Sequence, residues 1–553
     1  MNTMRIMKFV TFSFILSVGI SLLTGCSDDD SKSTVLLRPV TTCEASHNTV
    51  QLKWQYVEDA TEYIIELYRA TDDGYELYKT YSTDQTSYVI EGLDWDEKYK
   101  IKVKSSGHNR ESAYWETSEI AVSYPTKLGE TKTIDNAAKI TWQEGGNAIT
   151  ALKAFSEDGT EEKTFTDIDY ESGSAIIKGL TPETSYKVCA YSGTEQTVDT
   201  YEGRVMITTQ SAEDYDAQYG EGKWIDLREI TDPLYFNSAD FWNSLDEGTA
   251  IILSGGSNFN FGERPGINKS VTFVTALTLG ENAKFFMKNA FALATDTKVE
   301  SLTFKGIDFV GVIDDNYSIR PVEEETSKSF SAKQVFNENG TNSTLTTLNF
   351  INCNFASFRA LVRLQADNDL VENLNIKGCT INGIGDQGAI STNNKALTLK
   401  NITIEDCTIS NVVMLADFRV SASESIFSII DCTFCYAPLE GTSNQLIRIS
   451  KNTAQVNVSN TIWGVPMATS SSGLTTNAAG TQASRMSDSK TFSPTVSNTW
   501  KTNFNMDSGC PFVNASDAGI DEQAMFQDPV NGNFKIKGQF GGATSAGATK
   551  WRN

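Results

Sequence analysis

Four cysteines stand between the same apolar neighbours, and this repeat limits the possible folds more than any other feature of the chain. The pattern is apolar-x-x-Cys-x-apolar, and its copies read FINCNF, IKGCTI, IEDCTI and IIDCTF. Two further segments, FKGIDF and VSNTIW, carry another residue at the cysteine position. In order, the positions are Ile307, Cys353, Cys379, Cys407, Cys432 and Thr461, separated by 46, 26, 28, 25 and 29 residues. Recurrence at such a period is typical of repeat architectures, in which each copy forms one structural unit.

Each copy consists of short alternating strands with Asn, Gly or Asp at the breaks, so the repeats predict turns of a right-handed parallel β-helix. Successive coils stack about 4.8 Å apart, and equivalent residues then form ladders. We expect Cys353, Cys379, Cys407 and Cys432 to form one inward ladder of reduced thiols, because free cysteine packs as a small hydrophobe. Disulfides are the alternative in an oxidising compartment, but side chains in register run parallel and do not converge. The first spacing predicts one coil with an insertion at 314–330.

The start of the chain has the layout of a secretory signal. Arg5 and Lys8 precede an apolar stretch, which ends in LTGC at Cys26. This ending resembles a bacterial lipobox, which implies cleavage after residue 25 and lipidation of Cys26. An uncleaved membrane anchor is the alternative, although the apolar stretch is short for a span. Residues 27–35 read as an acidic tether and resemble the export signal of Bacteroidota-type surface lipoproteins.

The overall charge argues against nucleic acid as a partner. The chain has a formal charge of −24 and a pI near 4.6, so it would repel a phosphate backbone. Residues 341–460 hold 8 Lys and Arg against 10 Asp and Glu, a net charge of −2. This stretch contains the cysteine repeats, and it is the part of the chain that least repels an anionic ligand.

Two stretches ahead of the repeats read as small antiparallel β domains. Alternating apolar residues run through 49–70 and 86–107 in one, and through 137–144 and 174–193 in the other. The segment LTPETSY, which ends at Tyr186, resembles the corner of a fibronectin type III module, where the tyrosine hydroxyl bonds to the backbone.

We place fibronectin type III-like modules at 36–125 and 127–209, and we expect them to act as spacers. The first departs from the corner pattern, because Trp95 stands where the second has a proline. Trp54 and Trp142 are expected to lie in the sandwich cores and not on sugar-binding surfaces.

The rest of the chain resembles pectate-lyase-like β-helices: residues 247–275 are similar to their entry, and residues 525–538 to their closing strand. We therefore expect a linker and cap at 210–246 and a β-helix domain at 247–553. The order of signal, tether, modules and β-helix resembles that of Bacteroidota-type surface lipoproteins of polysaccharide-utilisation systems. The resemblance implies an all-β protein, anchored by lipid in the outer membrane and facing the cell exterior. It also implies that the protein handles polysaccharide together with other glycan-uptake proteins.

Three arginines of the repeat region stand between apolar residues. They are Arg363, Arg419 and Arg448, in VRL, FRV and IRI. Strand alternation would place the arginines outside and their neighbours inside, which predicts an outward cationic row. The guanidinium fork binds carboxylates in a bidentate manner, which favours a pectin-like polyuronate as ligand. The alternative is ordinary surface arginines, with Arg419 neutralised by Asp417 two residues earlier.

Catalytic patterns in the repeats are weak. Lyases of the pectate-lyase type use acids that hold Ca²⁺ beside a basic residue, and the nearest approach is Asp417 with Arg419, helped by Asp406 or Asp431 on another sheet. No Asp-Asp pair within a coil of 341–460 suggests a two-carboxylate hydrolase, and no histidine follows His108 to form a zinc site. We favour a glycan-binding protein without a cofactor. A Ca²⁺-dependent lyase, a hydrolase and a structural adhesin are the alternatives.

Overall fold

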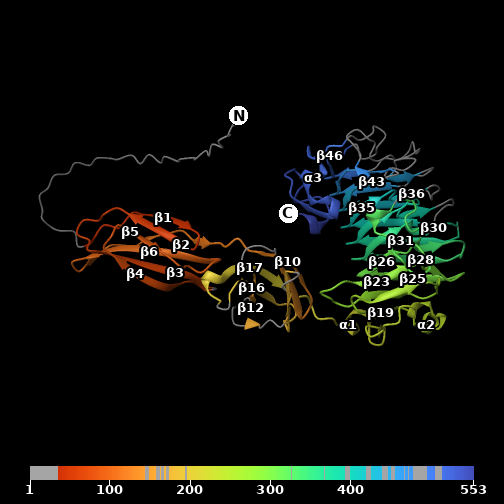
Figure 1. The fold of residues 1–553 in the computed structure, drawn as a ribbon, viewed down its shortest axis with the longest axis horizontal. Coiled ribbons are helices and arrows are strands. Elements are labelled where there is room, and N and C mark those ends of the chain that lie inside the picture. The colour runs from red at the N-terminus through yellow and green to blue at the C-terminus, as the bar shows by residue number, and fades with distance from the viewer. Residues whose placement is uncertain are drawn as a thin grey trace. The chain divides into compact units, whose positions relative to one another are not determined.

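The structure, a computed structural model, is almost entirely β (Figure 1). It describes residues 35–552 except 72, 143–147, 157–161, 164–166, 170–172, 194–195, 326, 367, 393–398, 419–424, 439–445, 450–454, 466, 471–472, 477–494 and 505–513. Within these ranges no helix is long and apolar enough to cross a membrane. The helices are α1 (Tyr215–Tyr219), α2 (Ala239–Ser244), α3 (Glu522–Met525), and the 3-10 turns η1 (Val198–Thr200), η2 (Tyr235–Asn237), η3 (Val322–Glu324), η4 (Pro529–Asn531) and η5 (Thr549–Trp551).

The first module contains two antiparallel sheets around one apolar core. One sheet comprises β1 (Thr41–Ser46), β2 (Thr49–Trp54) and β5 (Ser87–Ile90). The other comprises β4 (Gly74–Thr83), β3 (Glu62–Thr71), β6 (Glu97–Gly107) and β7 (Arg110–Glu111), with β8 (Trp115–Glu116) and β9 (Ile120–Val122) also paired to β6. Alternate residues of these strands, such as Leu52, Ile65 and Ile101, are fully buried. Trp54 is 6% exposed and belongs to this core, which confirms the prediction.

The second module also has two antiparallel sheets. Their strands are β10 (Leu128–Thr133), β11 (Ala137–Trp142), β15 (Ser174–Lys178) and β14 (Asp167–Asp169) in one, and β13 (Glu162–Lys163), β12 (Ala151–Ser156), β16 (Ser185–Tyr191) and β17 (Tyr201–Thr208) in the other. Trp142 is only partly buried, so its assignment to the core is less complete than that of Trp54. The chain divides into two compact units, and the division runs through this module. The boundaries 127–209 therefore stay a prediction.

Both modules have a tyrosine corner. The Tyr186 hydroxyl accepts a hydrogen bond from the backbone N–H of Thr181 at 3.0 Å, as the LTPETSY pattern predicts. The Tyr99 hydroxyl accepts one from the backbone N–H of Asp94 at 3.1 Å. Because the bond is made to the backbone, Trp95 in place of a proline does not prevent the corner from forming.

The C-terminal region is a parallel β-solenoid of three sheets (Figure 1). Sheet 1 comprises β18 (Trp224–Asp226), β19 (Thr249–Leu253), β22 (Val271–Thr275), β25 (Lys298–Lys305), β28 (Thr344–Ile351), β31 (Leu370–Lys377), β34 (Leu399–Glu405), β37 (Ile426–Ile430), β40 (Gln455–Ser459) and β44 (Thr495–Ser497). Sheet 2 comprises β20 (Asn258–Phe261), β23 (Ala283–Met287), β26 (Ile307–Gly311), β29 (Asn354–Phe358), β32 (Thr380–Ile384), β35 (Thr408–Val412), β38 (Thr433–Cys435), β41 (Ile462–Trp463), β45 (Trp500–Lys501) and β46 (Ser516–Asp517). Sheet 3 comprises β27 (Gln334–Glu338), β30 (Ala360–Leu364), β33 (Ile390–Thr392), β36 (Ala416–Phe418) and β39 (Ile447–Ile449), and the short pair β21 (Gly266–Ile267) and β24 (Ala292–Leu293) forms a separate sheet.

A sharp corner joins sheets 1 and 2 immediately before each ladder residue. The corner residue has a positive φ of 39° to 64° in every described coil from β25 onward. These residues are Gly306, Asn352, Gly378, Asp406, Asp431, Asn460 and Asn498. Gly, Asn and Asp tolerate this left-handed conformation best, which explains why only these residue types precede the ladder position.

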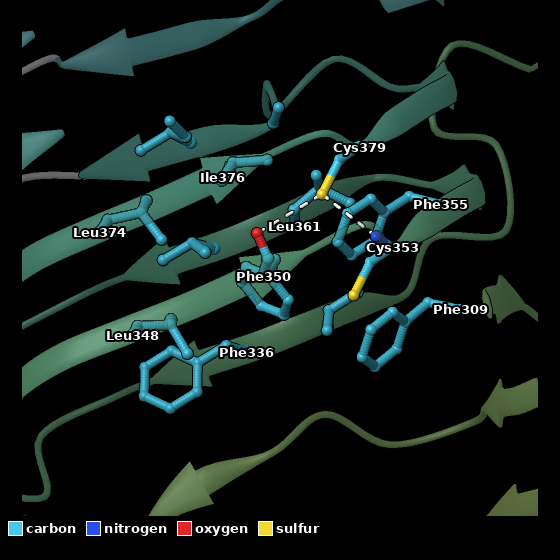
Figure 2. Close-up of a cluster of buried hydrophobic side chains, with 14 of the residues drawn as sticks. Phe309, Phe336, Leu348, Phe350, Cys353, Phe355, Leu361, Leu374, Ile376 and Cys379 are labelled. Atoms are coloured by element: carbon cyan, nitrogen blue, oxygen red, sulfur yellow. Dashed lines mark hydrogen bonds between the residues drawn. The ribbon is translucent and has the colours of Figure 1, made fainter. Parts of the chain in front are cut away.

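The cysteine ladder is buried and unbridged, which confirms the prediction. Figure 2 shows Cys353 and Cys379 packed among Phe350, Phe355 and Ile376 of adjacent strands. The backbone N–H of Cys353 donates to Sγ of Cys379 at 3.4 Å, and that thiol donates to the carbonyl of Phe350 at 3.5 Å. Burial raises the pKa of the Cys379 thiol, so it stays protonated and able to donate.

The predicted insertion is also present. β25 pairs directly with β28, with Phe304 opposite Phe350, so the long first spacing is a single coil. The extra residues lie between β26 and β27 and contain η3. Val322 and Phe330 of this insertion pack on Val413 of the solenoid. A Cβ at Gly383 would lie 2.7 Å from Val322, so this close approach requires glycine there.

Two further segments cover the solenoid. Phe236 of η2 and Trp242 of α2 join its core at the first coils, where the cap was predicted. The expectation of a closing strand at 525–538 is wrong, because β47 (Phe526–Asp528) and β48 (Asn533–Ile536) pair antiparallel with each other and lie outside the three parallel sheets. This hairpin packs its apolar side on residues of sheet 2, including Ile462. A second hairpin is formed by β42 (Met467–Ser470) and β43 (Gly473–Thr476).

Candidate functional site

One row of polar residues runs across sheet 3, perpendicular to its strands. In register, the row reads Asn337, Arg363, Ser391, Asp417 and Arg448. The described side chains on both sides of it in the strands are buried, such as Val362 and Leu364 beside Arg363. Alternation in a strand therefore separates this row from the core-facing side chains. We call these five residues the sheet 3 row.

The register brings two of the three predicted arginines together. Arg363 and Arg448 occupy equivalent positions three strands apart, or about 14 Å at the usual strand spacing. β36 ends at Phe418, and Arg419 lies outside the described residues. Asp417 takes the position in the row that the prediction gave to Arg419. The row therefore mixes charges and is not purely cationic in the part that the structure describes.

The middle of the row is shielded from solvent. Ser391 and Asp417 are both 0% exposed, whereas Arg363 is partly exposed. In register, the acidic residue Asp417 lies one strand from Arg448 and two strands from Arg363. Arg363 is the arginine of the row whose side chain the structure describes, and it is partly exposed.

The other acidic candidates serve a structural purpose at the corner between sheets 1 and 2. Asp406 accepts hydrogen bonds from the backbone N–H and the hydroxyl of Thr549 at 2.6 and 2.8 Å. Asp431 pairs with Arg552 at 2.5 Å. Both aspartates thereby hold the C-terminal segment, and neither belongs to the sheet of Asp417, as predicted. In the described part of the chain, no three His, Cys, Asp or Glu residues are grouped so that they could hold a metal ion.

Sequence reasoning missed a buried acidic pair beside the row. Glu338 and Asp369 are 1% and 0% exposed, and the Thr341 hydroxyl lies 2.7 Å from Oε2 of Glu338 and 2.8 Å from Oδ1 of Asp369. Burial raises the pKa of Glu338 to about 7. Glu338 stands opposite Leu364 of the next coil, which is an inward apolar residue. An acidic residue at an inward position is the signal that could have revealed the pair.

The comparisons with known proteins concern the N-terminal modules. No protein-family model matches the chain. Mouse Tenascin-N is 25% identical over 175 residues, which are 31% of this chain and 11% of that protein. The chain thus spans about a tenth of the length of this curated relative.

Solved structures give matches of the same kind. An fn3 domain of the human collagen alpha-1(XX) chain is 23% identical, covers 17% of this chain and 94% of its own, and has a TM-score of 0.15. A segment of two fibronectin type III domains from chicken tenascin is 15% identical, covers 31% of this chain and 99% of its own, and has a TM-score of 0.16. The strands and registers of the structure itself define the class: fibronectin type III-like modules followed by a parallel β-solenoid.

Proposed function

We propose that the chain is a cell-surface lipoprotein whose β-solenoid binds an acidic polysaccharide, such as a pectin-like polyuronate. The observation that carries the proposal is the sheet 3 row, in which Arg363 and Arg448 share one register position. Fibronectin type III-like modules combined with a β-solenoid are consistent with a surface, adhesion or polysaccharide-related role. The near-balanced charge of residues 341–460 also favours an anionic ligand over the rest of this acidic chain.

The chemistry of the row suits a uronate chain laid across the strands. A guanidinium group forms paired hydrogen bonds to a carboxylate, and Asn337 and Gln365 beside it carry amides for sugar hydroxyls. Nε2 of Gln365 donates to Oδ1 of Asn337 at 2.8 Å, which fixes both amides next to Arg363. Asp417 limits the net charge of the row, so we expect modest affinity per sugar and a gain from the many repeats of a polymer.

The N-terminal half would place this surface away from the cell. In our proposal, lipid on Cys26 holds the chain in the outer membrane, residues 27–35 give a solvated tether, and the two modules act as spacers. Cys26 and the tether up to residue 34 lie outside the described residues. Other glycan-uptake proteins at the same membrane would receive the polysaccharide.

Binding of polygalacturonate by the chain from Ser27 onward tests the proposal. Arg363→Ala should weaken binding, and the loss should shrink as salt rises, because charge-assisted contacts are screened. Arg359→Ala is a matched control, since it removes an arginine just before the same strand, outside the sheet 3 row, where Arg359 pairs with Asp386 at 2.8 Å. Equal binding by the parent and the Arg363 variant would refute the assignment. The appearance of unsaturated uronide in the presence of Ca²⁺ would replace it with the lyase alternative.

A further inference from the structure

A pocket of about 460 Å³ lies where three segments meet on the outside of sheet 2. Asn382, Ser410 and Asn411 come from the solenoid, Glu323 comes from the insertion, and Phe534 comes from the C-terminal hairpin. The volume falls within the range of about 300–1,000 Å³ that is typical of small-molecule sites. Asn411 has a positive φ of 53° near the end of its sheet 2 strand, which makes it a second corner of the coil. We call this site the corner pocket.

The solenoid side of the pocket presents ordered amides. Oδ1 of Asn382 accepts hydrogen bonds from Nδ2 of Asn411 at 2.8 Å and from the Ser410 hydroxyl at 3.3 Å. These bonds fix the orientation of both amides. Among the described residues, Nδ2 of Asn382 and Oδ1 of Asn411 have no partner, which leaves one amide nitrogen to donate and one amide oxygen to accept from a ligand.

Tyr436 adds an unusual group to the wall. It occupies the second corner of its coil, in register with Ser357, Gly383 and Asn411, and like them it has a positive φ. An aromatic residue is rare in that conformation, and such backbone strain often marks a functional position. Tyr436 is only 4% exposed, and its hydroxyl has no hydrogen-bond partner in the part of the chain that the structure describes.

The charge of the pocket separates it from the sheet 3 row. Among the described residues that line it, Glu323 is the one charged side chain, so a polyanion would be repelled. Amides, hydroxyls and a single carboxylate suit a ligand rich in hydroxyl groups, and the ring of Phe534 and the side chain of Val322 offer apolar contact for its C–H faces.

We propose that the corner pocket binds a neutral sugar unit, whose hydroxyls pair with Asn382, Asn411 and Tyr436. The inference goes beyond the proposed binding of acidic polysaccharide, because it concerns another surface and another ligand chemistry. A glycan with a uronate backbone and neutral branches would engage both sites.

Calorimetric titration of the chain with short neutral xylo-, arabino-, galacto- and gluco-oligosaccharides tests this site. At least one class should bind, and Tyr436→Phe should weaken it about fivefold through loss of one hydrogen bond. The same variant should be at least as stable as the parent, because the buried hydroxyl has no partner to lose among the described residues. Asn382→Ala should weaken binding more strongly, since it also releases Asn411.

The control is Asn375→Ala, which removes a similar amide pair on sheet 1, where Nδ2 of Asn375 donates to Oδ1 of Asn349 at 2.9 Å. Arg363→Ala should leave neutral oligosaccharide binding unchanged, so failure of the proposed function and failure of this inference are distinguishable. The inference is overturned if no class binds, or if the Tyr436 and Asn382 variants bind as tightly as the parent.

Discussion

The cysteine ladder and the sheet 3 row are both lines of residues in register across the same solenoid, but they differ in composition. The ladder repeats one small apolar residue four times and continues as Thr461, which accepts a hydrogen bond from the backbone N–H of Cys432 in the same way. The row changes at every strand, from amide to guanidinium to hydroxyl to carboxylate. Repetition follows from packing coil on coil, whereas the varied row shows no such constraint from coil to coil.

The largest expected effect is a change of stability with pH that comes from Glu338. This residue places a titratable group at an inward position where the next coil has an apolar residue. Burial raises its pKa from 4.5 to about 7, so the native state holds its proton more tightly than the unfolded chain. The corresponding stabilisation is complete below pH of about 4.5 and is lost as pH rises through about 7, which amounts to about 3 kcal/mol. Urea unfolding at a series of pH values should show this decline in the parent.

Glu338→Gln is the matched variant, since the amide oxygen can still accept the N–H of Leu293. The difference in free energy of unfolding between the variant and the parent should rise by most of about 3 kcal/mol between pH 5 and pH 8. This is about the pH range over which the raised pKa acts. A constant difference across this range would mean that Glu338 is ionised in the native state and that its surroundings are more polar than its burial indicates.

The sequence predicted the ladder because its spacing is visible in one line of residues. The place of Arg419 stays a prediction, because this residue lies outside the described ones. The position opposite Arg448 is held by Asp417, and Asp417 and Arg419 both stand between apolar residues, in ADF and FRV. A register shift of two preserves that alternation, so local pattern could not choose between them. The corner pocket was beyond prediction, since it joins residues near 322, 411 and 530 that only the folded chain brings together.

A smaller loss of stability is expected from a substitution within the cysteine ladder. Cys407→Ser places a hydroxyl where the thiol now donates to the carbonyl of Glu405 at 3.2 Å, and Thr461 makes the same bond to Ser459 at 2.9 Å. The new hydroxyl therefore has a partner, and we expect a loss of about 1 kcal/mol in the free energy of unfolding. Cys43→Ser in the first module is the comparison, because Cys43 is only partly buried and should cost less.

The redox state of the ladder is tested by counting the reactive thiols of the parent protein after denaturation without a reductant. All four ladder thiols should react. A Cys379–Cys407 bridge detected by mass spectrometry would contradict the packing interpretation of the ladder.

The smallest effect should come from the outer face of sheet 1, where charges also lie in register but are exposed. Lys377 pairs with Glu405 at 2.7 Å, and the two side chains are 47% and 38% exposed. Such a pair contributes about 0.5 kcal/mol or less, because solvent and salt screen it and both side chains lose freedom. Lys377→Ala should therefore leave both the urea midpoint and polygalacturonate binding nearly unchanged, whereas Arg363→Ala on sheet 3 should weaken binding while keeping the fold. If removal of either cation weakens binding equally, attraction comes from charge anywhere on the solenoid, and the register of the sheet 3 row has no special part in it.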